Sequence, residues 1–140
     1  MGSKAGIVAI LGTPNAGKST LFNRLVGMPL AGVTPKPQTT RFLITGLLNH
    51  ELGQAVLLDT PGLIAQPKNA WHEALNRHSH RAAREADVIL YLLALRERRE
   101  GPLRDSLYFP EWLPALQKPL LIGITHADEV PPGSREARLT

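Results

Sequence analysis

The segment Gly12–Ser19, with the sequence GTPNAGKS, constrains the possible folds of this chain more than any other feature. It matches the pattern G-x-x-x-x-G-K-[ST] at every required position. The short apolar run Gly6–Leu11 precedes it and predicts a buried strand, whereas Lys18–Gly27 has apolar residues at helical spacing. A strand, a glycine-rich loop and a helix in this order predict an anion-binding loop at the N-terminus of the helix.

The residues of this loop suit a bound phosphate chain. Gly12 and Gly17 allow the backbone to turn sharply and to approach phosphate oxygens closely. The N–H groups of the loop then point inward and favour an anion. We expect Lys18 to reach the β- and γ-phosphates and Ser19 to ligate Mg²⁺. The alternative is a glycine-rich turn between a strand and a helix that binds nothing.

The rest of the chain alternates apolar runs with helical patterns. A turn at Asn49–Gly53 between two apolar runs predicts an antiparallel hairpin, and the prolines of Met28–Gln38 and Thr60–Asn69 predict loops. Continuous apolar strands between helices predict an α/β fold over residues 1–140, with a mostly parallel sheet, one antiparallel edge strand and helices on both faces. The predicted strands are Arg41–Leu48, Gln54–Asp59, Val88–Leu95 and Pro119–Thr125, the predicted helix is Ala70–Glu85, and Leu103–Gln117 is predicted to be partly helical.

Composition excludes several classes of site. The chain has no cysteine, which excludes disulfides and cysteine-ligated metals. Its net charge of +4 favours anionic partners such as nucleotide or RNA, or describes an ordinary soluble domain with a small excess of arginine. The longest apolar run, Val88–Leu95, is far shorter than a membrane span, so we expect a cytoplasmic protein that requires no membrane. Trp71 and Trp112 have no evident aromatic partner and are interpreted as packing residues.

A second motif, Asp59-Thr60-Pro61-Gly62, begins at the last residue of an apolar run. A carboxylate at the carboxyl end of such a strand faces the ligand crevice, where it can hold Mg²⁺. Gly62 can offer its backbone N–H to a γ-phosphate without obstruction by a side chain. The same four residues also suit a simple turn. Because they follow a complete phosphate loop, we favour the metal-binding interpretation.

The segment Pro37–Arg41, with the sequence PQTTR, lies between these two motifs. A threonine hydroxyl there could complete the Mg²⁺ shell when a triphosphate is bound, and the order of the loop would then depend on the γ-phosphate. The alternative is a polar loop that leads into a strand.

Together, GTPNAGKSTLFN, PQTTR and DTPGL closely resemble the Era branch of the bacterial Era/TrmE-type translation GTPases. The resemblance extends from Ile7 to about Asp128, and its three motifs occur in order with suitable spacing. It implies a Mg²⁺-dependent GTPase that binds GTP and GDP, with Thr40 as the switch I ligand of the metal. It also implies the small ribosomal subunit or its RNA as a partner, and it leaves the oligomeric state open.

The same resemblance makes position 63 informative about hydrolysis. Ras-like enzymes have a glutamine there that orients the attacking water, whereas this chain has Leu63. Relatives with an apolar residue at this position hydrolyse GTP slowly alone, and some use K⁺ held partly by a loop asparagine that corresponds to Asn15. We therefore expect slow intrinsic turnover and hypothesise that K⁺ at Asn15 neutralises charge in the transition state.

The segment Thr125-His126-Ala127-Asp128 ends the last predicted strand, where this family carries Asn-Lys-x-Asp. The Asp128 carboxylate can accept from N1–H and the exocyclic N–H of guanine, a pair that adenine does not offer. Thr125 can still form hydrogen bonds, and His126 can still stack on a purine. The alternative is a turn in which the aspartate caps a helix.

The resemblance also implies a longer G domain. A complete one continues with a helix, a strand and another helix, and Era adds an RNA-binding KH domain. We therefore expect residues 1–140 to be a G domain that is incomplete at its C-terminus and lacks the KH domain. One edge of the sheet is then expected to be unpaired, with an uncovered apolar face.

The sequence leaves two other functions open. Leu63 and the changed base loop favour a guanine-nucleotide-binding module that does not hydrolyse, whereas Asp128 and the D-T-P-G motif disfavour a P-loop ATPase or kinase. The predicted site comprises Lys18, Thr40 and Gly62 for catalysis, Ser19, Thr40 and Asp59 for Mg²⁺, and Asn15, Ala16, Gly17, Lys18, Ser19, Thr20, Asp59, Gly62, Thr125, His126 and Asp128 for the nucleotide.

Overall fold

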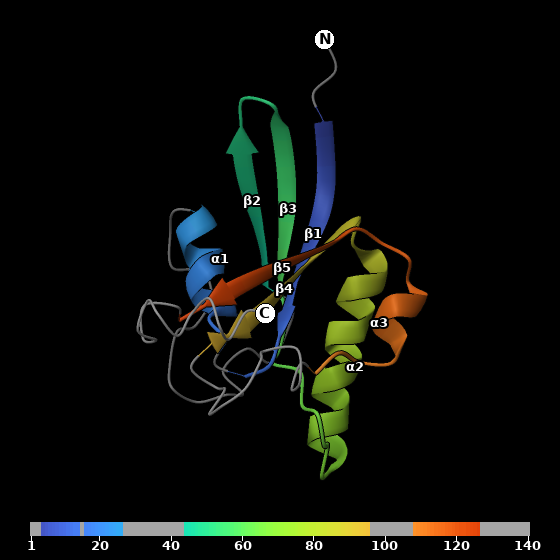
Figure 1. Ribbon diagram of the computed structural model, residues 1–140. Helices are drawn as coiled ribbons and strands as arrows, with labels where there is room; N and C mark the ends of the chain where they lie inside the picture. The colour runs from blue at the N-terminus through green and yellow to red at the C-terminus, as the bar shows by residue number, and fades with distance from the viewer. Residues whose placement is uncertain (1–3, 15, 27–43, 96–107, 127–140) are drawn as a thin grey trace.

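The computed structural model describes residues 4–14, 16–26, 44–95 and 108–126, which form five strands and three helices (Figure 1). Residues 41–43 and 103–107 of the predicted elements lie outside the described residues, and so does the proline-rich loop 28–38. In chain order the elements are β1 (Lys4–Gly12), α1 (Lys18–Val26), β2 (Ile44–His50), β3 (Gly53–Asp59), α2 (Ala70–Glu85), β4 (Val88–Ala94), α3 (Trp112–Ala115) and β5 (Leu120–Thr125).

The strands form one sheet in the order β2-β3-β1-β4-β5. The pairs β1–β3, β1–β4 and β4–β5 are parallel, and β2–β3 is antiparallel, which confirms the predicted sheet and its hairpin. Ile10 of β1 lies opposite Asp59 of β3, and Gly12 lies opposite Leu92 of β4. The carboxyl ends of three neighbouring strands therefore meet at one edge of the sheet.

The central strand β1 is apolar throughout its second half because both of its faces are covered. Ile10 packs with Phe22 of α1, whereas Ala9 packs with Ala82 of α2 and Leu11 belongs to a core that includes Leu113 of α3. Successive side chains of a strand point to opposite faces, so alternate residues pack on the two faces of the sheet. Figure 1 shows the same arrangement, with α1 on one side of the sheet and α2 and α3 on the other.

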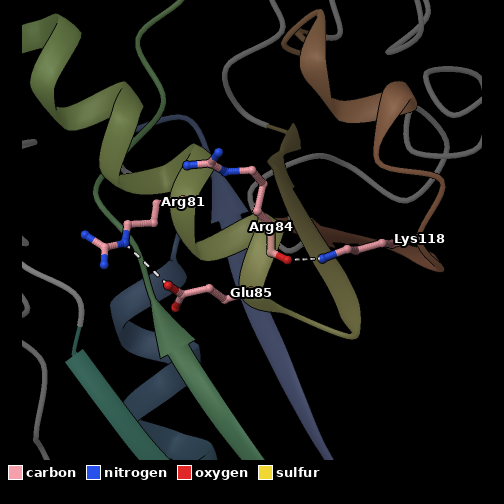
Figure 2. A network of polar contacts seen from close by, with 4 residues as sticks. All are labelled: Arg81, Arg84, Glu85 and Lys118. Atoms are coloured by element: carbon pink, nitrogen blue, oxygen red, sulfur yellow. Dashed lines mark hydrogen bonds and ion pairs between the residues drawn. The ribbon is translucent and has the colours of Figure 1, made fainter.

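Helix α2 has the predicted bounds, and polar groups bind its free backbone at both ends. At its N-terminus the Asn69 side chain accepts a hydrogen bond of 2.8 Å from the His72 N–H. At its C-terminus Lys118 Nζ donates to the carbonyl oxygens of Ala83, Arg84 and Ala86 at 2.8, 2.5 and 2.6 Å, and Figure 2 shows the bond to Arg84. A cation at this position binds carbonyls that the helix leaves free and complements the helix dipole.

The two tryptophans differ in their surroundings. Trp112, the first residue of α3, packs against the core and also stacks on His80 of α2, with ring centroids 4.3 Å apart and planes inclined by 11°. The expectation that Trp112 has no aromatic partner is therefore wrong, because α3 folds back onto α2. Trp71 is 47% exposed in the first turn of α2, so it lies outside the buried core.

Strand β5 is the last strand of the described sheet and carries apolar side chains into solvent. Leu121 is 60% exposed and Ile122 is 49% exposed. Within the described residues this agrees with the predicted uncovered apolar edge. None of the helices in the described part of the chain is long and apolar enough to span a membrane.

We expect Lys118→Met to lower the free energy of unfolding by about 1–2 kcal/mol, because it removes a charged donor from three carbonyl groups at the end of α2. Chemical denaturation monitored by circular dichroism measures this. Arg81→Ala is the matched control, since its ion pair with Glu85 is exposed and spans 3.4 Å (Figure 2), and we expect it to cost about 0–0.5 kcal/mol. Equal losses in the two variants would contradict the capping role of Lys118.

Candidate nucleotide-binding site

The predicted phosphate loop connects the end of β1 to the start of α1. Within it the Ala16 N–H donates to the Thr13 carbonyl at 3.2 Å, which closes a tight turn. Gly17 has a φ of 94°, in the region that residues with a side chain rarely adopt. The second glycine of the motif is therefore required by the backbone conformation just before the helix begins.

Lys18 begins α1, and its side chain folds back over the loop. Its Nζ donates to the Thr13 carbonyl at 2.8 Å, and the residue is only 7% exposed. A lysine is rarely buried to this extent unless its ammonium group has partners. The loop thus holds a positive charge at the position where the sequence predicts the phosphates.

Ser19 and Asp59 are brought together from α1 and the end of β3. Ser19 Oγ donates to Asp59 Oδ2 at 2.9 Å. Asp59 is fully buried, and this burial raises the pKa of its carboxyl, whereas the bond from Ser19 and the charge of Lys18 act to lower that pKa. Two of the three residues predicted to ligate the metal are therefore in direct contact.

The second carboxylate oxygen of Asp59 supports a metal at this point. Asp59 Oδ1 is buried and has no hydrogen-bond partner among the described residues. A buried carboxylate oxygen without a partner is costly, and a bound cation would satisfy it. A hydroxyl and a carboxylate side by side are oxygen ligands of the kind that Mg²⁺ binds, so the residues present fit this ion.

The D-T-P-G segment lies directly against the phosphate loop. Thr60 Oγ1 donates to the Ile10 carbonyl at 2.7 Å, and the Leu63 N–H donates to the Gly12 carbonyl at 2.8 Å. A Cβ atom added at Gly62 would lie 2.7 Å from Pro14 Cα, closer than side chains approach a backbone. Position 62 therefore requires glycine because the two loops are in backbone contact there.

Leu63 points away from this contact. Its side chain is 1% exposed and packs in the core on the α2 side of the sheet, together with Leu11 and Tyr91. The sequence shows that residue 63 has no polar side chain, and the structure adds that its side chain faces the interior. Residue 63 is therefore a core residue in this conformation.

Thr125 forms a link to the phosphate loop that the sequence analysis did not predict. Its Oγ1 donates to the Ala16 carbonyl at 2.7 Å and lies 3.3 Å from the Leu93 carbonyl. Because a hydroxyl has one proton, the shorter contact is the stronger candidate for the bond. Thr125 therefore connects the predicted base loop to the phosphate loop. Its place at the carboxyl end of a strand was the signal that could have indicated this.

Of the remaining predicted site residues, the structure describes some and not others. Thr20 lies exposed in the first turn of α1, and His126 follows β5 with a left-handed φ of 57°. Asn15, Thr40 and Asp128 lie outside the described residues. The K⁺ ligand, the switch I ligand of the metal and the base-selecting carboxylate therefore stay predictions.

Comparisons with known proteins agree with this geometry. A family model described as 50S ribosome-binding GTPase matches residues 7–126. GTPase Era of Caldicellulosiruptor saccharolyticus is 38% identical over 128 residues, which are 91% of this chain and 42% of that protein. GTPase Era of Heliobacterium modesticaldum is 38% identical over 136 residues, 97% of this chain and 43% of that protein. The chain thus spans less than half the length of these curated relatives.

Two solved structures share the fold. A point variant of Aquifex aeolicus Era bound to GDP·AlF₄⁻ is 34% identical with a TM-score of 0.81, and the match covers 94% of this chain and 44% of that one. Era in complex with MgGDPNP and nucleotides 1506–1542 of 16S ribosomal RNA is 34% identical with a TM-score of 0.82, covering 95% and 44%. These likenesses confirm the predicted fold class and the resemblance to Era.

We expect Thr125→Val to weaken GDP binding and to lower the free energy of unfolding by about 1 kcal/mol, because it removes the hydrogen bond to the phosphate loop and retains the shape of the side chain. Fluorescence titration with a labelled GDP and denaturant unfolding measure the two effects. Thr125→Ser retains the hydroxyl and is the control. If the valine and serine variants bind GDP equally well, the bond does not support the site.

Proposed function

Because the chain belongs to the family of 50S ribosome-binding GTPases, we propose that it binds GTP with Mg²⁺ and hydrolyses it to GDP and phosphate. The observation that carries this proposal is the 2.9 Å bond between Ser19 and the buried Asp59, beside the enclosed Lys18. A hydroxyl, a carboxylate and an ammonium group at the mouth of a phosphate loop are the components of a Mg²⁺-nucleotide site.

Each of these residues has one task in the proposed reaction. Lys18 holds oxygens of the β- and γ-phosphates and neutralises the charge that develops on them. Ser19 and Asp59 would hold the metal, which would supply further positive charge beside the phosphates. Gly62 donates its N–H to the γ-phosphate. The water oxygen bonds to the γ-phosphorus as the bond to the bridging oxygen breaks, and the water protons leave on the phosphate and the solvent.

Three predicted residues complete this proposal. Thr40 adds a hydroxyl to the metal shell when GTP is bound, and Asp128 selects guanine through its two N–H groups. Since Leu63 is a core residue, its side chain does not orient the attacking water. We therefore propose slow intrinsic turnover that K⁺ at Asn15 accelerates.

The relatives also suggest where the protein acts. One Era structure contains a segment of 16S ribosomal RNA together with MgGDPNP. We infer that this chain takes part in assembly of the small ribosomal subunit in the cytoplasm through ribosomal RNA, as its relatives and its net charge of +4 suggest.

A second candidate function is a guanine-nucleotide-binding module that does not hydrolyse. Leu63 favours it, because a leucine side chain has no polar group for catalysis and this one faces the core. Binding and hydrolysis assays on the same preparation distinguish the two functions.

Competition of GTP, GDP and ATP for a fluorescent GDP, with and without Mg²⁺, tests the proposed site. We expect GTP and GDP to compete and ATP to fail, and we expect Mg²⁺ to strengthen GTP binding. Asp59→Asn should reduce this Mg²⁺ effect by about tenfold or more, since even indirect partners of a metal contribute that much.

The control is Asp87→Asn, which changes a carboxylate near the other end of β1, where Asp87 Oδ2 accepts from the Ile7 N–H at 2.8 Å. We expect it to leave the Mg²⁺ effect unchanged. Displacement of the fluorescent GDP by ATP, or an undiminished Mg²⁺ effect in Asp59→Asn, would contradict the proposal.

The K⁺ hypothesis predicts faster GTP turnover in KCl than in NaCl at equal ionic strength, because a cation at Asn15 would neutralise charge in the transition state. Phosphate release measures the rates, and Asn15→Ala should remove the difference. Equal rates of the unmodified chain in the two salts would rule the hypothesis out.

A further inference from the structure

The segment that follows Asp59 lies between the phosphate loop and α2. Its bonds to the phosphate-loop side come from Thr60 and Leu63, as described above. On its other side α2 presents two polar residues, Asn76 and Ser79, which both bind backbone atoms of this segment. They are three positions apart in the helix and therefore lie on the same face.

Asn76 uses both ends of its amide. The Ile64 N–H donates to Asn76 Oδ1 at 2.9 Å, and Asn76 Nδ2 donates to the Ile64 carbonyl at 2.9 Å. Two bonds from one planar amide to a single residue fix both the position and the orientation of that residue. The Asn76 amide thus pairs with the N–H and the carbonyl of Ile64, as the backbone of a neighbouring strand would. The segment has already left the sheet at this point.

Ser79 binds the same segment at Pro61, three residues before Ile64. It is fully buried, and its Oγ lies 2.9 Å from the Pro61 carbonyl and 3.3 Å from the carbonyl of Leu75 in its own helix. The shorter distance indicates that the single hydroxyl proton is shared mainly with Pro61. Serine is a weaker helix former than alanine, so a buried serine in the middle of α2 is better explained by this bond than by helix stability.

These bonds hold the residues on both sides of Gly62. Pro61 is bound by Ser79 and Ile64 by Asn76, while the Leu63 N–H is bound by the Gly12 carbonyl. The Gly62 N–H forms no hydrogen bond with another residue in the described part of the chain. Because Gly62 also lies against Pro14, its free N–H is held at the phosphate loop.

We propose that Asn76 and Ser79 are positioning residues that hold the Pro61–Ile64 segment so that the Gly62 N–H meets the γ-phosphate. The role rests on the proposed function, because it requires a γ-phosphate at this loop. Both side chains act through the backbone of the segment, in place of any polar side chain at Leu63.

The test compares GDP with a β,γ-imido analogue of GTP, using Kd values from competition with a fluorescent GDP. Only the analogue has a γ-phosphate, so loss of the positioning bonds should weaken its binding and leave GDP binding unchanged. We expect Asn76→Ala and Ser79→Ala each to lower the ratio of analogue affinity to GDP affinity by about three- to tenfold, as loss of a buried hydrogen bond does. The single-turnover rate of GTP hydrolysis should fall with this ratio.

Arg77→Ala is the matched control, since Arg77 is exposed and lies between the two residues in sequence. We expect it to leave the affinity ratio unchanged. If the two test variants lose thermal stability but retain the ratio, the bonds serve the fold alone and the proposal is overturned. Should Asn76→Ala fail to fold, Ser79→Ala decides the question, because it removes one hydroxyl and introduces a strong helix former.

The two proposals fail in different ways. An unchanged ratio in variants of a chain that binds the GTP analogue overturns the positioning role alone. Failure of the unmodified chain to bind the analogue overturns the proposed function and the positioning role with it.

Discussion

The pairing of β1 with β3 on one side and β4 on the other determines where the described parts of the phosphate site lie. Because β1 is parallel to both neighbours, its last residue, Gly12, arrives at the same edge of the sheet as the ends of those strands. The phosphate loop then begins between Asp59 and Leu92. A loop that leaves an interior strand is enclosed by its neighbours, and this enclosure explains how Lys18 and Asp59 can both be buried.

Buried polar groups are concentrated at this edge. Among the described residues, the buried polar or charged side chains are Lys18, Asp59, Thr60 and Ser79. The first three belong to the phosphate loop or to the segment beside it, and Ser79 of α2 binds that segment at Pro61. Burial of a polar group is costly unless it has a partner. Lys18, Thr60 and Ser79 each bind a backbone carbonyl, and Asp59 accepts from Ser19 while its second oxygen has no described partner. The energetically costly burial of polar groups is therefore concentrated at the candidate site.

The helix α2 connects this edge to the rest of the molecule. Its middle binds the segment after Asp59 through Asn76 and Ser79, and its end is held by Lys118, which precedes β5. Strand β5 in turn ends at Thr125, which binds the phosphate loop at Ala16. Segments that are far apart in the sequence therefore support one another around the candidate site.

Local sequence patterns were enough to predict most of the helices and strands and the chemistry of the two motifs. Local periodicity and glycine placement are sufficient to predict a strand, a phosphate loop and a helix, and they placed both ends of α2 correctly at Ala70 and Glu85. The proximity of Ser19 and Asp59 could be predicted because each belongs to a recognisable motif. Both motifs follow parallel strands, whose carboxyl ends meet at one edge of the sheet.

Other contacts between distant segments depend on the folded arrangement of the whole chain. The bond from Thr125 to Ala16 spans 109 positions, and no local pattern specifies it. The inward direction of Leu63 and the stacking of Trp112 on His80 likewise depend on which element covers each face of the sheet. Sequence patterns report what each segment prefers within a few residues, whereas contacts of this kind are fixed by strand order and packing, which the whole chain sets together.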